Sequence, residues 1–81
     1  MEISEIDLEP YRVNKKIALI PPIECTVWRR DSNKKKGSPD EFIKVEVKLL
    51  HTSALSWDNT ISFICEAKNG EKFATNEKNI I

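Results

Sequence analysis

The chain has 81 residues, of which 40% are hydrophobic and 32% charged, and its 13 basic and 13 acidic residues give a formal net charge of zero. Chains of this composition fold as soluble globular proteins, which excludes an intrinsically disordered chain and a membrane-spanning one. The length predicts a single domain over residues 1–81 with a small core. Because no basic and apolar leader opens the sequence, we expect a cytoplasmic protein that does not bind membranes.

The N-terminal segment is acidic and has isoleucine or leucine at three of its first eight positions. Ser4 and Asp7 can cap a single helical turn, which Pro10 would then end, and a short edge strand fits the same pattern. Residues 16–20 are apolar after a basic start. The prolines at positions 21 and 22 are expected to end any element that forms there.

A β-strand is predicted over residues 23–28, because apolar and polar side chains alternate there. Ile23, Cys25 and Val27 share the apolar face of this strand. The other face ends with Trp28, which is therefore expected to point away from the core. Residues 29–40 are polar and contain a glycine and a proline, so they are predicted to form a loop.

The segment after this loop carries two conflicting signals. Ser38, Pro39 and Glu41 form a strong helix start, with an N-cap, a proline in the first turn and a capping-box acid. The next apolar residues recur at every second position, which is the period of a strand and would scatter them around a helix. We therefore predict a strand over residues 42–50, preceded at most by one short helical turn and followed by a loop over residues 51–59.

Residues 60–75 predict a β-hairpin with its turn at residues 68–70. A two-residue Asn-Gly turn would place Phe73 on the polar face of the hairpin. A three-residue loop, with Gly70 in the left-handed conformation as a β-bulge, pairs Cys65 with Phe73 and gathers both apolar sets on one side. We predict this second register.

Three well-patterned strands, a fourth after the turn and one or two more near the termini predict a mainly β protein. A small antiparallel sheet of this size is expected to curl into an SH3-like or OB-like barrel, because closure removes sheet edges that would otherwise aggregate. The apolar C-terminal residues Ile80 and Ile81 are expected to dock as a short strand.

The sequence carries no catalytic or cofactor motif. Two glycines do not make a dinucleotide-binding or phosphate-binding loop, and one histidine with two separated cysteines does not make a zinc site. Cys25 and Cys65 are predicted to be buried thiols, with a disulfide across the core as the alternative. A catalytic pair with His51 is disfavoured because burial raises a thiol pKa. We therefore expect a protein that is not an enzyme and binds no cofactor or metal.

Charge is distributed unevenly along the chain. Residues 1–9 contain four acids, residues 10–36 contain eight bases and two acids, and the remainder contains five bases and seven acids. The candidate binding residues are the basic and aromatic side chains Trp28, Arg29, Arg30, Lys34, Lys35 and Lys36, together with Trp57 in the later loop.

These residues support two hypotheses. Tryptophan and arginine are enriched at the energetic centres of protein interfaces, so the first hypothesis is an inhibitor, adaptor or assembly component that binds another protein. Phe42, Leu50 and Ile64 lie opposite the main apolar faces and either extend such a surface, in a complex or a homo-oligomer, or pack inside a closed barrel. The second hypothesis is a nucleic-acid-binding barrel, in which the bases contact phosphates and the aromatic residues stack; the zero net charge disfavours it.

Overall fold

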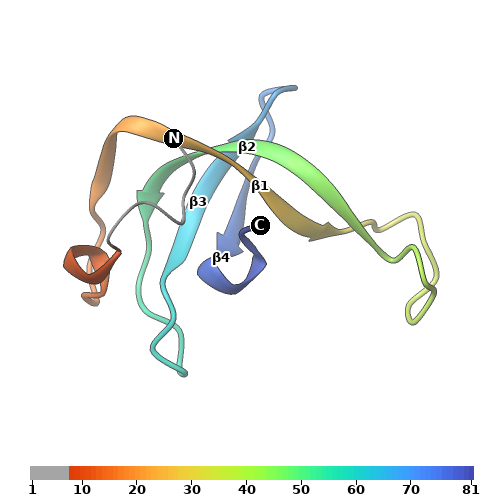
Figure 1. Ribbon diagram of the computed structural model, residues 1–81, viewed down its shortest axis with the longest axis horizontal. Helices are drawn as coiled ribbons and strands as arrows, with labels where there is room; N and C mark the ends of the chain where they lie inside the picture. The colour runs from red at the N-terminus through yellow and green to blue at the C-terminus, as the bar shows by residue number, and fades with distance from the viewer. Residues whose placement is uncertain (1–7) are drawn as a thin grey trace.

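The computed structural model describes residues 8–81 and shows a mainly β protein with a four-stranded antiparallel sheet (Figure 1). Each strand pairs with the next one along the chain, so the topology is a simple meander. The predicted class and the antiparallel sheet are confirmed. In chain order the elements are the 3₁₀ turn η2 (Glu9–Tyr11), strands β1 (Ala18–Arg30), β2 (Phe42–Thr52), β3 (Ser62–Ala67) and β4 (Lys72–Asn76), and the 3₁₀ turn η3 (Glu77–Asn79).

The four strands do not close the sheet into a barrel, because β1 and β4 form its two edges. The C-terminal residues nevertheless return to β1 after η3. Ile80 forms a single antiparallel bridge with Val27, and the Ile81 N–H donates to the Thr26 carbonyl over 2.9 Å. The expected docking of the C-terminus is therefore confirmed, through one bridge rather than a full strand.

β3 and β4 form the hairpin that the sequence predicts. Cys65 lies opposite Phe73, and the Ala67 N–H donates to the Glu71 carbonyl over 2.9 Å. Gly70 has a φ of 87°, a conformation that glycine adopts without the strain imposed by a side chain. The three-residue loop and its register are confirmed.

The conflict after the first loop is resolved in favour of a strand. β2 begins at Phe42, and the preceding segment forms only a turn, in which the Glu41 N–H donates to the Ser38 carbonyl over 3.2 Å. The predicted end of this strand is wrong, since β2 continues through His51 and Thr52. The extension has a local cause, because Thr52 is hydrogen-bonded to the segment that precedes β1.

The prediction that the two prolines end an element is also wrong, since β1 runs through Pro21 and Pro22. β1 lies at the edge of the sheet, where a residue without an N–H is tolerated. Its register with β2 shifts between Ala18 and Ile23. The prolines therefore lie in an irregular stretch of the edge strand, which leaves the Ile20 side chain 90% exposed.

The core lies on one face of the sheet, as the two-residue period of the strands requires. Partly buried side chains from both ends of the chain pack against it, among them Leu8, Tyr11 and Ile80. Both cysteines are free thiols rather than a disulfide, as predicted, but only Cys65 is buried and Cys25 is partly buried. The buried hydrophobic residues are Leu19, Val27, Val47, Leu49, Ile61, Phe63 and Cys65.

An ion pair joins the two 3₁₀ turns. The Arg12 guanidinium, just after η2, donates to both carboxylate oxygens of Glu77 over 2.6 and 3.3 Å. Glu77 also accepts the Ile61 N–H over 2.8 Å. Pro10 lies inside η2 and does not end it, and the rest of the predicted N-terminal element, residues 1–7, lies outside the described residues.

Candidate functional site

The first two strands continue beyond the rest of the sheet and form a projecting arm. β3 pairs with β2 only from Val47 to Thr52, whereas β1 pairs with β2 as far as Arg30 and Phe42. Figure 1 shows this two-stranded ribbon and its connecting loop reaching away from β3 and β4. We define the arm as residues 28–44.

The arm exposes large apolar side chains on both of its faces. Trp28 and Phe42, which are 41% and 55% exposed, lie on one face, because Trp28 stands opposite Lys44 and side chains alternate along β2. Ile43, which is 41% exposed, lies on the other face. The arm is too narrow to bury these groups, so they remain available to a partner.

Arg29 is among the predicted binding residues, but its guanidinium contacts residues of this protein's own β3–β4 hairpin. Its guanidinium lies 4.1 Å from the centre of the Phe73 ring and donates to both carboxylate oxygens of Glu71. These contacts tie the base of the arm to the β3–β4 hairpin. They also lower the pKa of the Glu71 carboxyl.

Carboxylates within the arm engage two more of its bases. Arg30 donates to Glu41 over 2.7 Å, and the Lys34 ammonium lies 3.1 Å from Asp40. Glu41 also accepts the Gly37 N–H over 2.9 Å, and this hydrogen bond is the main reason its pKa is lowered. The loop at the tip of the arm is therefore held by its own charged groups.

The remaining bases of the arm face solvent and have no carboxylate partner within residues 8–81. Lys35 and Lys36 form no ion pair with any residue in the range 8–81, and the Lys44 ammonium lies 5.3 Å from the centre of the Trp28 ring. The arm contains six bases and three acids, a net charge of +3, which the rest of the neutral chain balances. The apolar surface of the arm thus lies in a positive field.

Trp57 lies apart from the other predicted binding residues. The loop between β2 and β3 holds it 97% exposed, and this loop leaves the sheet in a different direction from the arm (Figure 1). The structure therefore brings together the candidates on β1 and its following loop, and does not bring Trp57 to them.

The sequence-based list of binding residues lacks Ile43, and the sequence analysis names Phe42 only as a residue that either extends such a surface or packs inside a barrel. Ile43 belongs to an apolar stripe that is buried further along β2, so alternation alone assigns it to the core. Strand length is the signal that could have identified both residues: β2 has 11 residues and β3 has six, so β3 cannot cover the start of β2.

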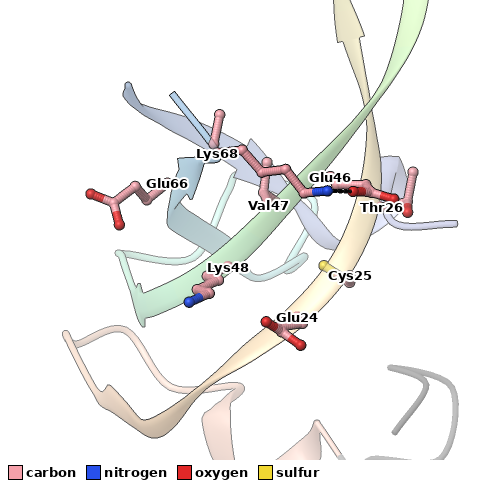
Figure 2. Close-up of a pocket in the computed structure, with 9 residues that line it drawn as sticks. Glu24, Cys25, Thr26, Glu46, Val47, Lys48, Glu66 and Lys68 are labelled. Atoms are coloured by element: carbon pink, nitrogen blue, oxygen red, sulfur yellow. Dashed lines mark ion pairs between the residues drawn. The ribbon is translucent and has the colours of Figure 1, made fainter. Parts of the chain in front are cut away.

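A hollow of about 660 Å³ lies over the middle of β1 and β2 and the end of β3 (Figure 2). Glu24, Lys48 and Glu66 lie in register across the three strands, and Lys68 forms an ion pair with Glu46. Opposite charges on neighbouring strands compensate one another. The hollow therefore presents mixed charge rather than the field of one sign that holds an anion or a cation.

The hollow is also lined by Cys25, whose surroundings disfavour the reactive thiolate form. Burial, with a smaller contribution from Cys65, raises the pKa of Cys25 to about 11, and burial also raises the pKa of Cys65. At neutral pH both groups are thiols rather than the nucleophilic thiolates.

We therefore expect Cys25 to be alkylated by iodoacetamide at pH 8 about a hundredfold more slowly in the folded protein than in the denatured protein, and the alkylation of Cys65 to be slower in the folded protein as well. Mass spectrometry of labelled peptides measures each rate, and Cys25→Ser isolates Cys65. A fast reaction of Cys25 in the folded state, or an intact mass two hydrogens lighter, would contradict this expectation.

Two features are absent from the described residues: clusters of side chains that could bind a metal ion, and helices that could span a membrane. Within residues 8–81, no group of three histidine, cysteine or acidic side chains is arranged to hold a metal ion. The same part of the chain has no helix with the length and apolar character needed to cross a bilayer.

Comparison with known proteins gives no family: no protein-family model, no curated protein and no solved structure matches this chain.

Proposed function

We propose that this protein is a non-enzymatic binding protein that docks onto another protein through its arm, as an inhibitor, adaptor or assembly component. The observation that supports this proposal most directly is the exposure of Trp28, Phe42 and Ile43 on a ribbon that has no core of its own. Fully burying an exposed side chain of this size contributes about 1.5 to 3 kcal/mol, and because these three are 41–55% exposed, each would contribute about half of that in a complex. A tryptophan beside arginine is also the composition typical of interface centres.

The rest of the fold suits the role of a scaffold. We propose that it is a small barrel of the SH3-like kind, in which the C-terminal segment covers the outer edge of β1. The Ile80–Val27 bridge and the hydrogen bond from Ile81 to Thr26 support this assignment over an OB-like barrel. Arg29 and its contacts would then hold the arm at a fixed angle to the barrel.

The nucleic-acid hypothesis has weaker support. Arg29, Arg30 and Lys34 each form an ion pair with a carboxylate, which reduces the positive charge available to phosphates. Trp28 and Trp57 also lie on different parts of the molecule and do not form one stacking platform. Titration with a fluorescent single-stranded oligonucleotide at low salt tests this hypothesis directly, and we expect no tight binding.

The docking hypothesis predicts which substitutions remove a partner. Affinity capture followed by titration of the purified partner should show binding weakened about thirtyfold by Trp28→Ala or by Phe42→Ala, which corresponds to about 2 kcal/mol. The fold should survive, because both side chains lie outside the core.

Trp57→Ala is the matched control, since it removes the same type of side chain from an exposed loop that lies away from the arm. Circular dichroism should show that all three variants retain the β-sheet signal. A partner that Trp57→Ala releases, while Trp28→Ala and Phe42→Ala retain it, would place the docking surface on the later loop instead.

A further inference from the structure

The arm has an open backbone edge. The pairing of β2 with β3 ends at Val47 and Ala67, so residues 42–46 of β2 have β1 on one side and no described strand on the other. Unpaired backbone N–H and C=O groups on such an edge form a template for a further strand.

The register shows which backbone groups face this open edge. The Asp31 N–H donates to the Glu41 carbonyl, so the odd-numbered residues at the start of β2 direct their backbone groups towards β1. The even-numbered residues Phe42 and Lys44 direct theirs to the open side. The same alternation holds on β1, where the Thr26 carbonyl points outward and accepts the Ile81 N–H.

We propose that the partner docks by adding an extended, acidic segment as a strand along the open edge of β2 at residues 42–46. This inference rests on the proposed docking function and specifies its geometry. Strand addition obtains affinity from main-chain hydrogen bonds and specificity from alternate side chains. Here one face of the added strand meets Phe42 and Lys44, and the other meets Ile43 and Val45.

The other sheet edges fit an added strand less well. The outer edge of β1 is occupied at Thr26 and Val27 by the C-terminal residues. β4 is only five residues long, and its side chains there are small or polar except for Phe73, which packs against the core. The open stretch of β2 combines free backbone groups with two exposed apolar side chains.

The positive charge of the arm favours a partner segment that is acidic. Lys44 lies on the open edge itself, and Lys35 and Lys36 at the tip add positive charge without carboxylate partners within residues 8–81. Acidic residues on the added strand complement this field. A second copy of the chain is disfavoured, because pairing two arms would bring together two net charges of +3.

Amide hydrogen exchange, measured by NMR, tests the inference on the full chain. The probe is a synthetic peptide that alternates glutamate with valine, and the control peptide has lysine in place of glutamate. In the free protein we expect the Phe42 and Lys44 amides to exchange fast and those of Ile43 and Val45 to be protected by β1. With the glutamate peptide, Phe42 and Lys44 should exchange at least about tenfold more slowly.

N-methylation of the peptide separates strand addition from side-chain docking. Methyl groups on alternate residues block hydrogen bonds on one side of the peptide only, so one methylation register should abolish binding and the other should retain it. Binding that is insensitive to both registers overturns strand addition. The proposal of an acidic partner is overturned if the Phe42 and Lys44 amides are protected by the lysine peptide or by a single-stranded oligonucleotide. It is also overturned if raising the protein concentration alone protects them.

Two double charge-reversal variants of equal net charge test whether the positive charge of the arm contributes to binding of the glutamate peptide. Lys35→Glu with Lys36→Glu changes the arm, whereas Lys15→Glu with Lys16→Glu changes the segment before β1. The first pair should weaken binding of the glutamate peptide about tenfold, and the second by much less. No detectable binding of the glutamate peptide overturns the inference, whereas the docking function fails only if a captured partner is insensitive to Trp28→Ala and Phe42→Ala.

Discussion

Replacing Glu77 with alanine is expected to lower the free energy of unfolding by about 2 to 3 kcal/mol, a large fraction of the stability of a chain this small. The Glu77 carboxylate accepts the Arg12 guanidinium and the Ile61 N–H, so alanine leaves both donors without this acceptor. Its side chain is only 18% exposed, and water replaces these contacts incompletely. Thermal denaturation followed by circular dichroism measures the loss.

Two other variants show which contact matters. Glu77→Gln keeps an acceptor for Ile61 but removes the charge, so it should destabilise the protein less than Glu77→Ala. Glu9→Ala removes a second carboxylate from Arg12, but its side chain is 72% exposed and it should have a much smaller effect. Equal losses for Glu9→Ala and Glu77→Ala would show that the part-buried contacts of Glu77 together contribute no more than the exposed ion pair of Glu9.

The same carboxylate predicts how stability depends on pH. Its hydrogen bonds from Arg12 hold the pKa of Glu77 below its usual range, and the Ile61 N–H adds to this effect. A carboxyl group with a lowered folded-state pKa stabilises the protein above its unfolded pKa, about 4.3, and this contribution is lost as the pH falls through the folded value. Other carboxyls share the trend, including Asp58, whose pKa is lowered to about 2 by Lys78 and Thr60. The difference in stability between the wild type and Glu77→Gln should therefore shrink between about pH 5 and pH 2.

Local patterns account for most of the fold. Alternation predicts the strands, and the position of Phe73 selects the three-residue loop over the two-residue one, because only that register gathers the apolar side chains. The predictions fail where tertiary contacts override local signals. Pro21 and Pro22 are tolerated because β1 lies at an edge, and Thr52 extends β2 because of a segment far away in the sequence.

The candidate site is only partly predictable, for a related reason. Trp28 is identified because it lies on the polar face of an alternating strand, whereas the exposure of Ile43 depends on the length of a neighbouring strand. Arg29 shows the opposite error: it lies in a basic run, but its position on the core face of β1 directs it onto Phe73 and Glu71. Charge along a chain does not show which charges its own fold will pair.

Two buried threonines are expected to respond in opposite ways to the same substitution. Thr52 is fully buried, and its hydroxyl accepts the Ile17 N–H over 2.8 Å and donates to the Lys15 carbonyl over 3.1 Å. Thr52→Val leaves both backbone groups without that partner and should lower the free energy of unfolding by about 2 kcal/mol. For a domain of this size the melting temperature should fall by roughly 10 °C.

Thr75 is buried as well, but its hydroxyl has no hydrogen-bond partner among residues 8–81. Thr75→Val removes an unsatisfied polar group while keeping the β-branched shape that suits a strand, so it should stabilise the protein by about 1 kcal/mol. Both variants replace a threonine hydroxyl with a methyl group, and the two hydroxyls differ in whether they are hydrogen-bonded. The sign of the change in the free energy of unfolding therefore reports the contribution of these hydrogen bonds. If both variants are destabilised equally, the Thr75 hydroxyl must have a hydrogen-bond partner. The hydrogen bonds of Thr52 would then contribute no more to stability than the hydrogen bond of Thr75.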